Sequence, residues 1–386
     1  MKPRWLEGNR IELLNSGHGY LPALCTALDV AAQEIFLETY IYAHDDGAAH
    51  VTAALCAAAR RGVRVHLLVD GFGARDMPAV TIAELKAAGV RFMFYRKPLL
   101  WRPVRGLRRM HRKLAVIDRR IAFAGGINII DDWNTPHEVP PRFDYAVRIE
   151  GPLAAAVRAA ARQLWFTVAL AAFKPRVRRT LALPEPAAAG TVRAALLVRD
   201  NLLHRTDIED AYLDAIRAAQ KQILIANSYF LPSMRFYRAL RMVARRGVQV
   251  TILLQGPSDH PLMKAATQSL YRHLLRAGIT LIEYRKSFLH AKVAVIDDAW
   301  ATVGSSNFDP FSLLLAREAN VLIDDPGFAV QLRTSLEAAI AGGGTRVTES
   351  ALRRSAWWGR AVQWLAYRFA RAVVDLVTPA GGRRLL

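Results

Sequence analysis

Apolar runs alternate along the chain with amphipathic stretches of helical spacing. Runs at 35–41 and 63–70 are separated by a helical stretch that ends in Arg60, Arg61 and Gly62. Short apolar runs bounded by glycine are typical of buried strands, and a glycine directly after a helical stretch is a common helix stop. The pattern therefore predicts strand, helix and strand in succession, which is the repeating unit of an α/β fold.

The same order of segments returns in the second half of the chain. Apolar runs at 223–230 and 248–255 flank a helical stretch that ends in Arg245, Arg246 and Gly247, and in each half a Leu-x2-Ala-Gly element precedes a third apolar run. A duplicated β-α-β-α-β sequence predicts two lobes related by a pseudo-twofold axis, and two independent similar domains are the alternative. We predict two pseudosymmetric α/β/α sandwich lobes, each with a mostly parallel mixed sheet, and an active site at the lobe interface.

The boundary between the halves lies within residues 174–190, where Arg, Pro and Ala dominate and the apolar periodicity stops. We assign residues 1–178 to the first lobe, 179–192 to a linker and 193–345 to the second lobe. In residues 346–386 apolar side chains recur at three- and four-residue steps opposite a row of arginines. This pattern predicts a basic amphipathic helix, which would either lie on a membrane surface or pack on the core.

Charge narrows the classes of partner. The chain has 53 Lys and Arg against 33 Asp and Glu, a net charge of +20, and such a balance suits anionic lipid or nucleic acid equally well. Two cysteines exclude a disulfide framework. The longest apolar run, at 164–173, is well short of the roughly 20 residues that a spanning helix needs. We therefore expect a protein that is not integral to a membrane.

Near the end of each half stands a His, with a Lys two residues later and an Asp five after that: His111, Lys113 and Asp118, then His290, Lys292 and Asp297. A glycine-rich element and an asparagine follow at matching distances, with Gly126 and Asn128 in the first half and Ser305 and Asn307 in the second. Residues two apart on a strand point to the same face, so each half can project an imidazole and an ammonium into one site. A phosphodiester displacement needs a nucleophile, a proton donor and fixed positive charge, which two such sets supply without a metal or other cofactor.

Imidazole can attack phosphorus and pass the group on as a phosphohistidine. One histidine must then be neutral and the other protonated. Asp144 and Glu318 stand at comparable places after the two motifs, and either carboxylate could hold the tautomer of an imidazole. The alternative is that both are ordinary acids on surface strands.

The stretches HRKLAVIDRRIAFAGGIN and HAKVAVIDDAWATVGSSNFD resemble the paired H-x-K-x4-D signatures of the phospholipase D superfamily. With VRIEGP and EANVLI after them, they resemble more narrowly the bacterial cardiolipin synthases of the short type that lacks N-terminal transmembrane helices. The resemblance implies that His111 is the nucleophile and His290 the general acid. It also implies phosphate contacts from Lys113, Lys292, Asn128 and Asn307, with Ser305 a further candidate. Asp118 and Asp297 complete the signatures, but their places at the far strand ends favour a supporting role.

The same resemblance implies a phosphatidyltransferase that makes cardiolipin from two phosphatidylglycerol molecules, releases glycerol and uses neither metal nor nucleotide. Its partners would be anionic phospholipids and a membrane surface, and it would lie on the cytoplasmic face of a bacterial inner membrane. Hydrolysis by the same site, as in a phospholipase D or a nuclease, is the first alternative. A catalytically inactive basic adaptor for membrane or nucleic acid is the second. Donor lipid and oligomeric state stay open.

A basic and apolar insert precedes the first motif. Residues 96–113 contain eight Lys or Arg and no acid, interleaved with leucines and a tryptophan, and the second half is shorter here. Cations near an anionic leaflet favour binding to it, so the insert predicts a membrane-facing entrance. A nucleic-acid groove would use the same cations but would not need the Leu-Leu-Trp. The candidate membrane contacts are Trp101, Arg102 and Arg105, with Trp358 and Arg360 in the C-terminal helix.

Overall fold

The chain is described here from a computed structural model, which covers residues 3–96, 108–172, 182–200, 204–257, 261–309 and 316–353. The five candidate membrane contacts lie outside these ranges, as do most of the predicted C-terminal helix and the first part of the linker.

The first lobe contains the elements β1 (Leu6–Asn15), α1 (Ser16–Asp29), β2 (Glu34–Thr39), α2 (Asp46–Arg60), β3 (Arg64–Asp70), α3 (Ala79–Ala87), β4 (Arg91–Tyr95), β5 (Arg109–Met110), β6 (Lys113–Ile117), β7 (Ile121–Gly125), β8 (Arg142–Phe143), β9 (Tyr145–Glu150) and α4 (Pro152–Ala171).

The second lobe repeats this order with β10 (Val192–Arg199), α5 (Asp207–Ala218), β11 (Gln222–Asn227), α6 (Met234–Arg245), β12 (Gln249–Gln255), α7 (Pro261–Arg276), β13 (Thr280–Tyr284), β14 (Phe288–Leu289), β15 (Lys292–Ile296), β16 (Trp300–Gly304), β17 (Ala316–Asp324) and α9 (Pro326–Gly343). Two short elements follow, β18 (Gly344–Arg346) and α10 (Glu349–Arg353).

The predicted segments appear at nearly the expected places. The runs at 35–41 and 223–230 form β2 and β11, and the runs at 63–70 and 248–255 form β3 and β12. Gly62 and Gly247 follow α2 and α6 with φ of 90° and 92°, a left-handed conformation in which a side chain is strained. The two glycines therefore end their helices as the sequence predicts.

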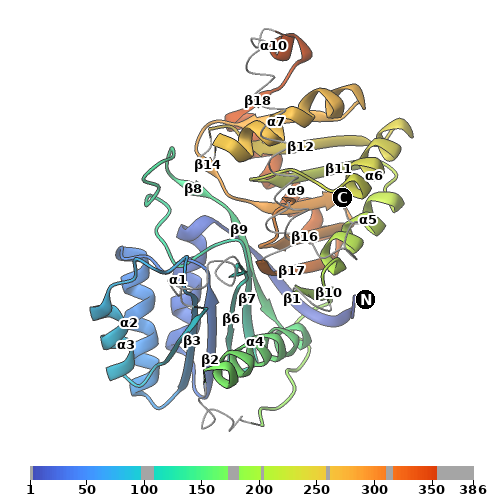
Figure 1. Cartoon of the computed structure of the whole chain (residues 1–386). Coiled ribbons are helices and arrows are strands. Elements are labelled where there is room, and N and C mark those ends of the chain that lie inside the picture. The colour runs from blue at the N-terminus through green and yellow to red at the C-terminus, as the bar shows by residue number, and fades with distance from the viewer. Residues whose placement is uncertain are drawn as a thin grey trace.

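The two lobes share one sheet. Among the described residues its order is β18-β13-β12-β11-β15-β16-β17-β10-β1-β9-β7-β6-β2-β3-β4, so the lobes join edge to edge through β1 and β10 (Figure 1). Asn9, fully buried on β1, ties this joint: its amide donates to the carbonyl of Val192 and accepts from the N–H of Leu153. The halves are thus parts of one unit and not independent domains.

Helices cover both faces of each half of the sheet, as the sandwich prediction requires. In the first lobe α1, α2 and α3 pack over one apolar core, and in the second lobe α5, α6 and α7 pack over its counterpart. A third core includes residues of α4 and α9 and draws on strands of both lobes. The α/β class with two sandwich lobes is therefore confirmed.

One detail of that prediction is wrong. The sheets are mixed, but among the described strands of the shared sheet parallel pairing is limited to β2–β3–β4 and β11–β12–β13, apart from the attached β5. The strands that begin with the motif lysines, β6 and β15, and those that follow them pair antiparallel. For β6–β7 and β15–β16 the reason is the turn of only a few residues that joins them, because such a turn cannot make the crossover that parallel neighbours need.

Candidate active site

Each motif histidine lies just before its strand, at the point where the two lobes touch. The N–H of His111 donates to the carbonyl of Arg317, 2.9 Å away on β17, and the N–H of His290 donates to the carbonyl of Phe143, 2.8 Å away on β8. The short strand before each histidine also pairs across the lobes, β5 with β17 and β14 with β8. Each histidine is therefore positioned by backbone of the opposite lobe.

The carboxylates cross in the same way. Nδ1 of His111 lies 3.0 Å from Oε1 of Glu318, and Nδ1 of His290 lies 2.6 Å from Oδ2 of Asp144. Both acids are buried, at 0% and 1% side-chain exposure. Each half thus supplies the histidine of one pair and the carboxylate of the other, and each Nδ1 contact leaves Nε2 as the ring nitrogen available to a substrate.

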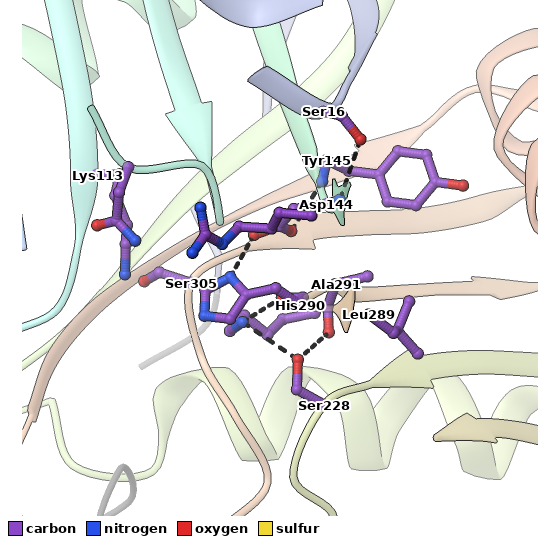
Figure 2. Close-up of polar contacts among 12 residues, drawn as sticks. Ser16, Lys113, Asp144, Tyr145, Ser228, Leu289, His290, Ala291 and Ser305 are labelled. Carbon is purple, nitrogen blue, oxygen red and sulfur yellow. Dashed lines mark hydrogen bonds and ion pairs between the residues drawn. The ribbon is translucent and has the colours of Figure 1, made fainter. Parts of the chain in front are cut away.

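The two lysines face the same space from opposite lobes. Lys113 is 3% exposed and donates to the carbonyl of His111 at 2.7 Å, and Lys292, at 0%, donates to the carbonyl of His290. Figure 2 shows Lys113 and Asp144 of the first lobe gathered with His290 and Ser305 of the second. The charges of Lys113 and Lys292 both act to lower the pKa of His111 and of His290. The four side chains therefore lie close enough to interact electrostatically.

Burial is the main cause of every pKa shift of these bases. It lowers the pKa of His111 and lowers the pKa of His290 well below its ordinary value. It also lowers the pKa of Lys113 to about 7 and the pKa of Lys292 to about 8. A buried cation without a bound anion is unfavourable, so burial in the free site favours the uncharged forms of these side chains. A phosphodiester that enters supplies the missing negative charge.

The two carboxylates are not equivalent. Burial raises the pKa of Asp144 to about 6, although Lys292, Lys113 and the N–H of Tyr145 act against it. Burial also acts to raise the pKa of Glu318, but the charges of His111, Lys113 and Arg199 with the His111 hydrogen bond outweigh it, so that pKa lies below its ordinary value. Asp144 therefore keeps a proton to higher pH than Glu318 does.

The asparagines lie buried beside the motif strands. Oδ1 of Asn128 accepts from the N–H of Ile41 at 3.0 Å, so its NH₂ group is the end left to donate to a ligand. Oδ1 of Asn307 is buried and has no hydrogen-bond partner within the described part of the chain. This atom is an acceptor and would need a donor as its partner, so the end of Asn307 that can bind a phosphate oxygen is its NH₂ group.

Ser305 is held differently from what the resemblance implied. Its hydroxyl donates to Oε2 of Glu318 and accepts from the N–H of Ala319 at 3.1 Å. With its hydrogen committed to a carboxylate, the hydroxyl is not available to donate to phosphate, and its contact is with the acid that holds His111.

Asp118 and Asp297 lie at the strand ends remote from the histidines. The carboxylate of Asp118 accepts the N–H groups of Ala32, Gln33 and Glu34 at 2.7–2.8 Å. Asp297 does the same for the three residues before and at the start of β11, at 2.6–2.8 Å. These acids clip the loop before β2 or β11 to the end of the motif strand and do not reach the reacting groups.

Three residues beside the site groups are not among the predicted site residues. The ring of Tyr40 packs edge-on against His111, with centroids 5.0 Å apart, and Nζ of Lys113 lies 5.6 Å from its centre. Ser228, at the same place after β11, lies 3.5 Å from Nζ of Lys292. Arg199, on β10, is 1% exposed and its charge acts on Glu318. Alignment of the two repeats would have paired Tyr40 with Ser228, but Arg199 carries no motif signal.

Comparison with known proteins gives a consistent result. The family model for the cardiolipin synthase phospholipase D-like domain matches residues 24–165 and 212–340. Cardiolipin synthase B of Escherichia coli is 41% identical over 98% of this chain and 91% of its own length, and cardiolipin synthase A of Pseudomonas fluorescens is 30% identical over 96% and 76%.

Among solved structures, a phosphatidylserine synthase of Haemophilus influenzae superposes with a TM-score of 0.69, covering 95% of this chain and 94% of that one at 16% identity. A polyphosphate kinase of Porphyromonas gingivalis reaches 0.54 over 86% of this chain and half of its own, also at 16% identity. These two likenesses concern the fold alone. With its two crossed histidine–carboxylate pairs, and matched on both lobes by the family model and over nearly its whole length by the synthases, the chain belongs to the cardiolipin synthase family of phospholipase D-like enzymes.

Proposed function

We propose that the protein makes cardiolipin by transferring a phosphatidyl group from one phosphatidylglycerol molecule to a second, with release of glycerol. The observation that carries this proposal is the pair of histidine–lysine sets, brought from opposite lobes to one place and each completed by a carboxylate of the other lobe. This arrangement suits the exchange of one phosphodiester for another, and the names of the 41% identical relatives support cardiolipin as the product.

In the first step Nε2 of His111 attacks the phosphorus of phosphatidylglycerol. The bond from phosphorus to the glycerol oxygen breaks, and the departing oxygen takes a proton from Nε2 of His290. Lys113 and Lys292 balance the charge on the non-bridging oxygens, with Asn128 and Asn307 as donors. The product of this step is phosphatidyl-histidine and free glycerol.

In the second step Nε2 of His290, which has given up its proton, removes the proton from a hydroxyl of another phosphatidylglycerol. That oxygen attacks the phosphorus, the bond to Nε2 of His111 breaks, and cardiolipin leaves with the enzyme in its starting state. One phosphodiester is exchanged for another, so the reaction needs no energy-rich cosubstrate. If water takes the place of the lipid hydroxyl, the same site releases phosphatidic acid.

The experiment is incubation of the pure protein with phosphatidylglycerol vesicles and, separately, with single-stranded DNA, both in the presence of EDTA. We expect cardiolipin and glycerol in equal amounts and no cleavage of DNA. His111→Ala and His290→Ala should each lower turnover at least a thousandfold, on the order of what triad members contribute. His137→Ala, an exposed histidine in the first lobe, is the matched control.

Phosphatidic acid as the main product would replace transfer by hydrolysis. Cleavage of DNA would indicate a nuclease, and inactivity on both substrates would favour the alternative of a catalytically inactive basic adaptor. Appreciable activity in both histidine variants would remove the two-histidine mechanism.

The place of action follows from the substrate and the charge. A lipid donor and a lipid acceptor are met at a membrane, and a net charge of +20 favours an anionic leaflet. None of the helices in the described part of the chain combines the length and the apolar character needed to cross a bilayer. We infer peripheral binding to the cytoplasmic face of a bacterial inner membrane, with phosphatidylglycerol and other anionic phospholipids as the partners.

A further inference from the structure

We propose that one difference between the repeats, Ser305 in the second lobe against Gly126 in the first, assigns different roles to the two histidines. Ser305 is a positioning residue that makes His111 the nucleophile, and Gly126 leaves Asp144 able to hold the proton that His290 delivers. This inference rests on the phosphodiester chemistry of the proposed function.

Positions 126 and 305 are equivalent in the fold. The N–H of Gly126 donates to the carbonyl of Tyr145 at 2.9 Å, and the N–H of Ser305 donates to the carbonyl of Ala319 at 3.0 Å. Each of those carbonyls belongs to the residue directly after the carboxylate that contacts a histidine. At this point of contact the second lobe therefore has a serine hydroxyl that the first lobe lacks, beside a glutamate in place of the aspartate.

On the His111 side the hydroxyl fixes the direction of the hydrogen bonds. The short contact of Ser305 Oγ is with Oε2 of Glu318, and its other acceptor, the carbonyl of Ala319, is farther away at 3.3 Å. Nδ1 of His111 also lies 3.2 Å from the backbone carbonyl of Ser305, which can only accept, so Nδ1 carries a proton and Glu318, which accepts from Nδ1 and from the Ser305 hydroxyl, is ionised. The ring proton of His111 then resides on Nδ1, and Nε2 presents a lone pair to the phosphorus.

On the His290 side there is no room for a hydroxyl. A Cβ on Gly126 would come within 2.4 Å of Oδ1 of Asp144, so the carboxylate occupies the space that the serine side chain fills in the other lobe. Oδ1 accepts from the N–H of Tyr145 at 2.7 Å, and within the described part of the chain Oδ2 has Nδ1 of His290 as its one hydrogen-bond partner. Oδ2 can therefore carry a proton and donate it to Nδ1 in a hydrogen bond, which leaves Nε2 of His290 with an N–H aimed at the leaving group. When that proton leaves, the proton of Asp144 moves to Nδ1 and the ring stays neutral.

The remaining charges around the two acids do not cancel this difference. His111, Lys113, Lys292 and Arg199 act on Glu318 or respond to its charge, and Asp309 acts on Arg199 and Lys292. Lys292, Lys113 and Arg142 act on Asp144. Both acids thus face buried cations, yet the pKa of Glu318 is lowered while burial raises that of Asp144 to about 6.

The test separates the two roles by the leaving group. Phosphatidyl-p-nitrophenol releases a phenolate that needs no proton, so the burst of p-nitrophenol reports on the nucleophile alone, whereas turnover of phosphatidylglycerol needs both histidines. The burst is measured at a series of acid pH values, and each sample is quenched into base so that p-nitrophenol can be read. The variants are Ser305→Ala, Ser305→Thr, which restores a hydroxyl, and the neighbouring Ser306→Ala as the control.

For Ser305→Ala we expect the acid limb of the burst rate to move up by about one pH unit, because a lost hydrogen bond to a charged group corresponds to a shift of that size. Ser305→Thr should return the limb toward that of the wild type, and Ser306→Ala should leave it in place. A rate that falls equally at every pH in Ser305→Ala would mean that the serine only packs, and would overturn the proposal.

The first lobe gives the complementary test. In Gly126→Ala and Asp144→Asn we expect the p-nitrophenol burst to persist within about tenfold while turnover of phosphatidylglycerol falls by a hundredfold or more, the range for a general acid. Digestion of the trapped intermediate should place the phosphoryl group on His111. A label on His290, or loss of the burst in Asp144→Asn, would overturn the assignment. A wild-type burst without cardiolipin from phosphatidylglycerol would instead count against the proposed function.

Discussion

At the scale of single residues, burial beside the two histidines lowers the pKa of Lys113 and of Lys292. Neither lysine has a carboxylate within salt-bridge distance in the described chain, and their pKa values fall to about 7 and about 8. Such a site binds an anion to regain the charge that desolvation opposes. Residues that rely on burial in this way should reveal it in their dependence on pH.

We therefore expect kcat/KM for phosphatidylglycerol to fall as pH rises through about 6 to 8. Asp144, with its pKa raised to about 6, and then Lys113, with its pKa lowered to about 7, are each protonated below those values and lose the proton above them. With phosphatidyl-p-nitrophenol, which needs no acid, the fall should start nearer the lysine values. The measurement is kcat/KM against pH for both substrates in mixed micelles. Identical alkaline limbs for the two would contradict the acid role of the Asp144–His290 pair.

At the scale of elements, the first motif strand is fixed at both ends by groups that take no part in the chemistry. Beside the motif, Arg112 is 2% exposed and forms an ion pair with Glu38 on β2. The sequence analysis had placed Arg112 among the cations of a membrane-facing insert. Alternation along the strand explains this, because the side chains flanking Arg112 point to the site while its own points to the opposite face. At the far end Asp118 clips the loop before β2.

Replacing Asp118 by Ala should therefore cost stability rather than chemistry. Three backbone N–H groups lose their acceptor, so we expect the free energy of unfolding to fall by about 1–3 kcal/mol and Tm to fall by a few degrees. The kcat of the folded fraction at 25 °C should stay within about threefold of that of the wild type, a limit that we take from the absence of contact with the reacting groups. Calorimetry and initial rates check the two parts, with the exposed Asp29→Ala as control. A hundredfold loss of kcat at unchanged Tm would make Asp118 catalytic.

At the scale of the whole molecule, the site exists only because the lobes are joined. Each histidine contacts a carboxylate of the other lobe, so neither half holds a complete histidine–carboxylate pair. Strand pairs between the lobes and an apolar core drawn from both halves hold the two together. The whole molecule also carries the net charge of +20 that should bring it to its lipid.

Binding to phosphatidylglycerol vesicles should therefore weaken about tenfold or more as salt rises from about 0.05 to about 0.5 M, because the Debye length shortens over this range. Sedimentation with vesicles measures it, and the His111→Ala variant avoids consumption of the lipid. Phosphatidylcholine vesicles serve as the control and should bind weakly at every salt concentration. Binding that salt does not change would contradict electrostatic attraction and would favour apolar insertion.

The sequence by itself determined the duplicated α/β lobes, the helix stops at Gly62 and Gly247, and the two His-Lys sets, because strand periodicity, glycine conformation and motif spacing are local properties. It also named Asp144 and Glu318 as candidates to hold the histidines. Only the tertiary structure decided that each carboxylate contacts the histidine of the other lobe and that Arg112 is buried. It also decided that Ser305 contacts Glu318, whereas the Asp144 carboxylate fills the space beside Gly126. These are contacts between segments far apart in the chain, and they depend on how the two halves of the sheet meet, for which no local pattern carries a signal.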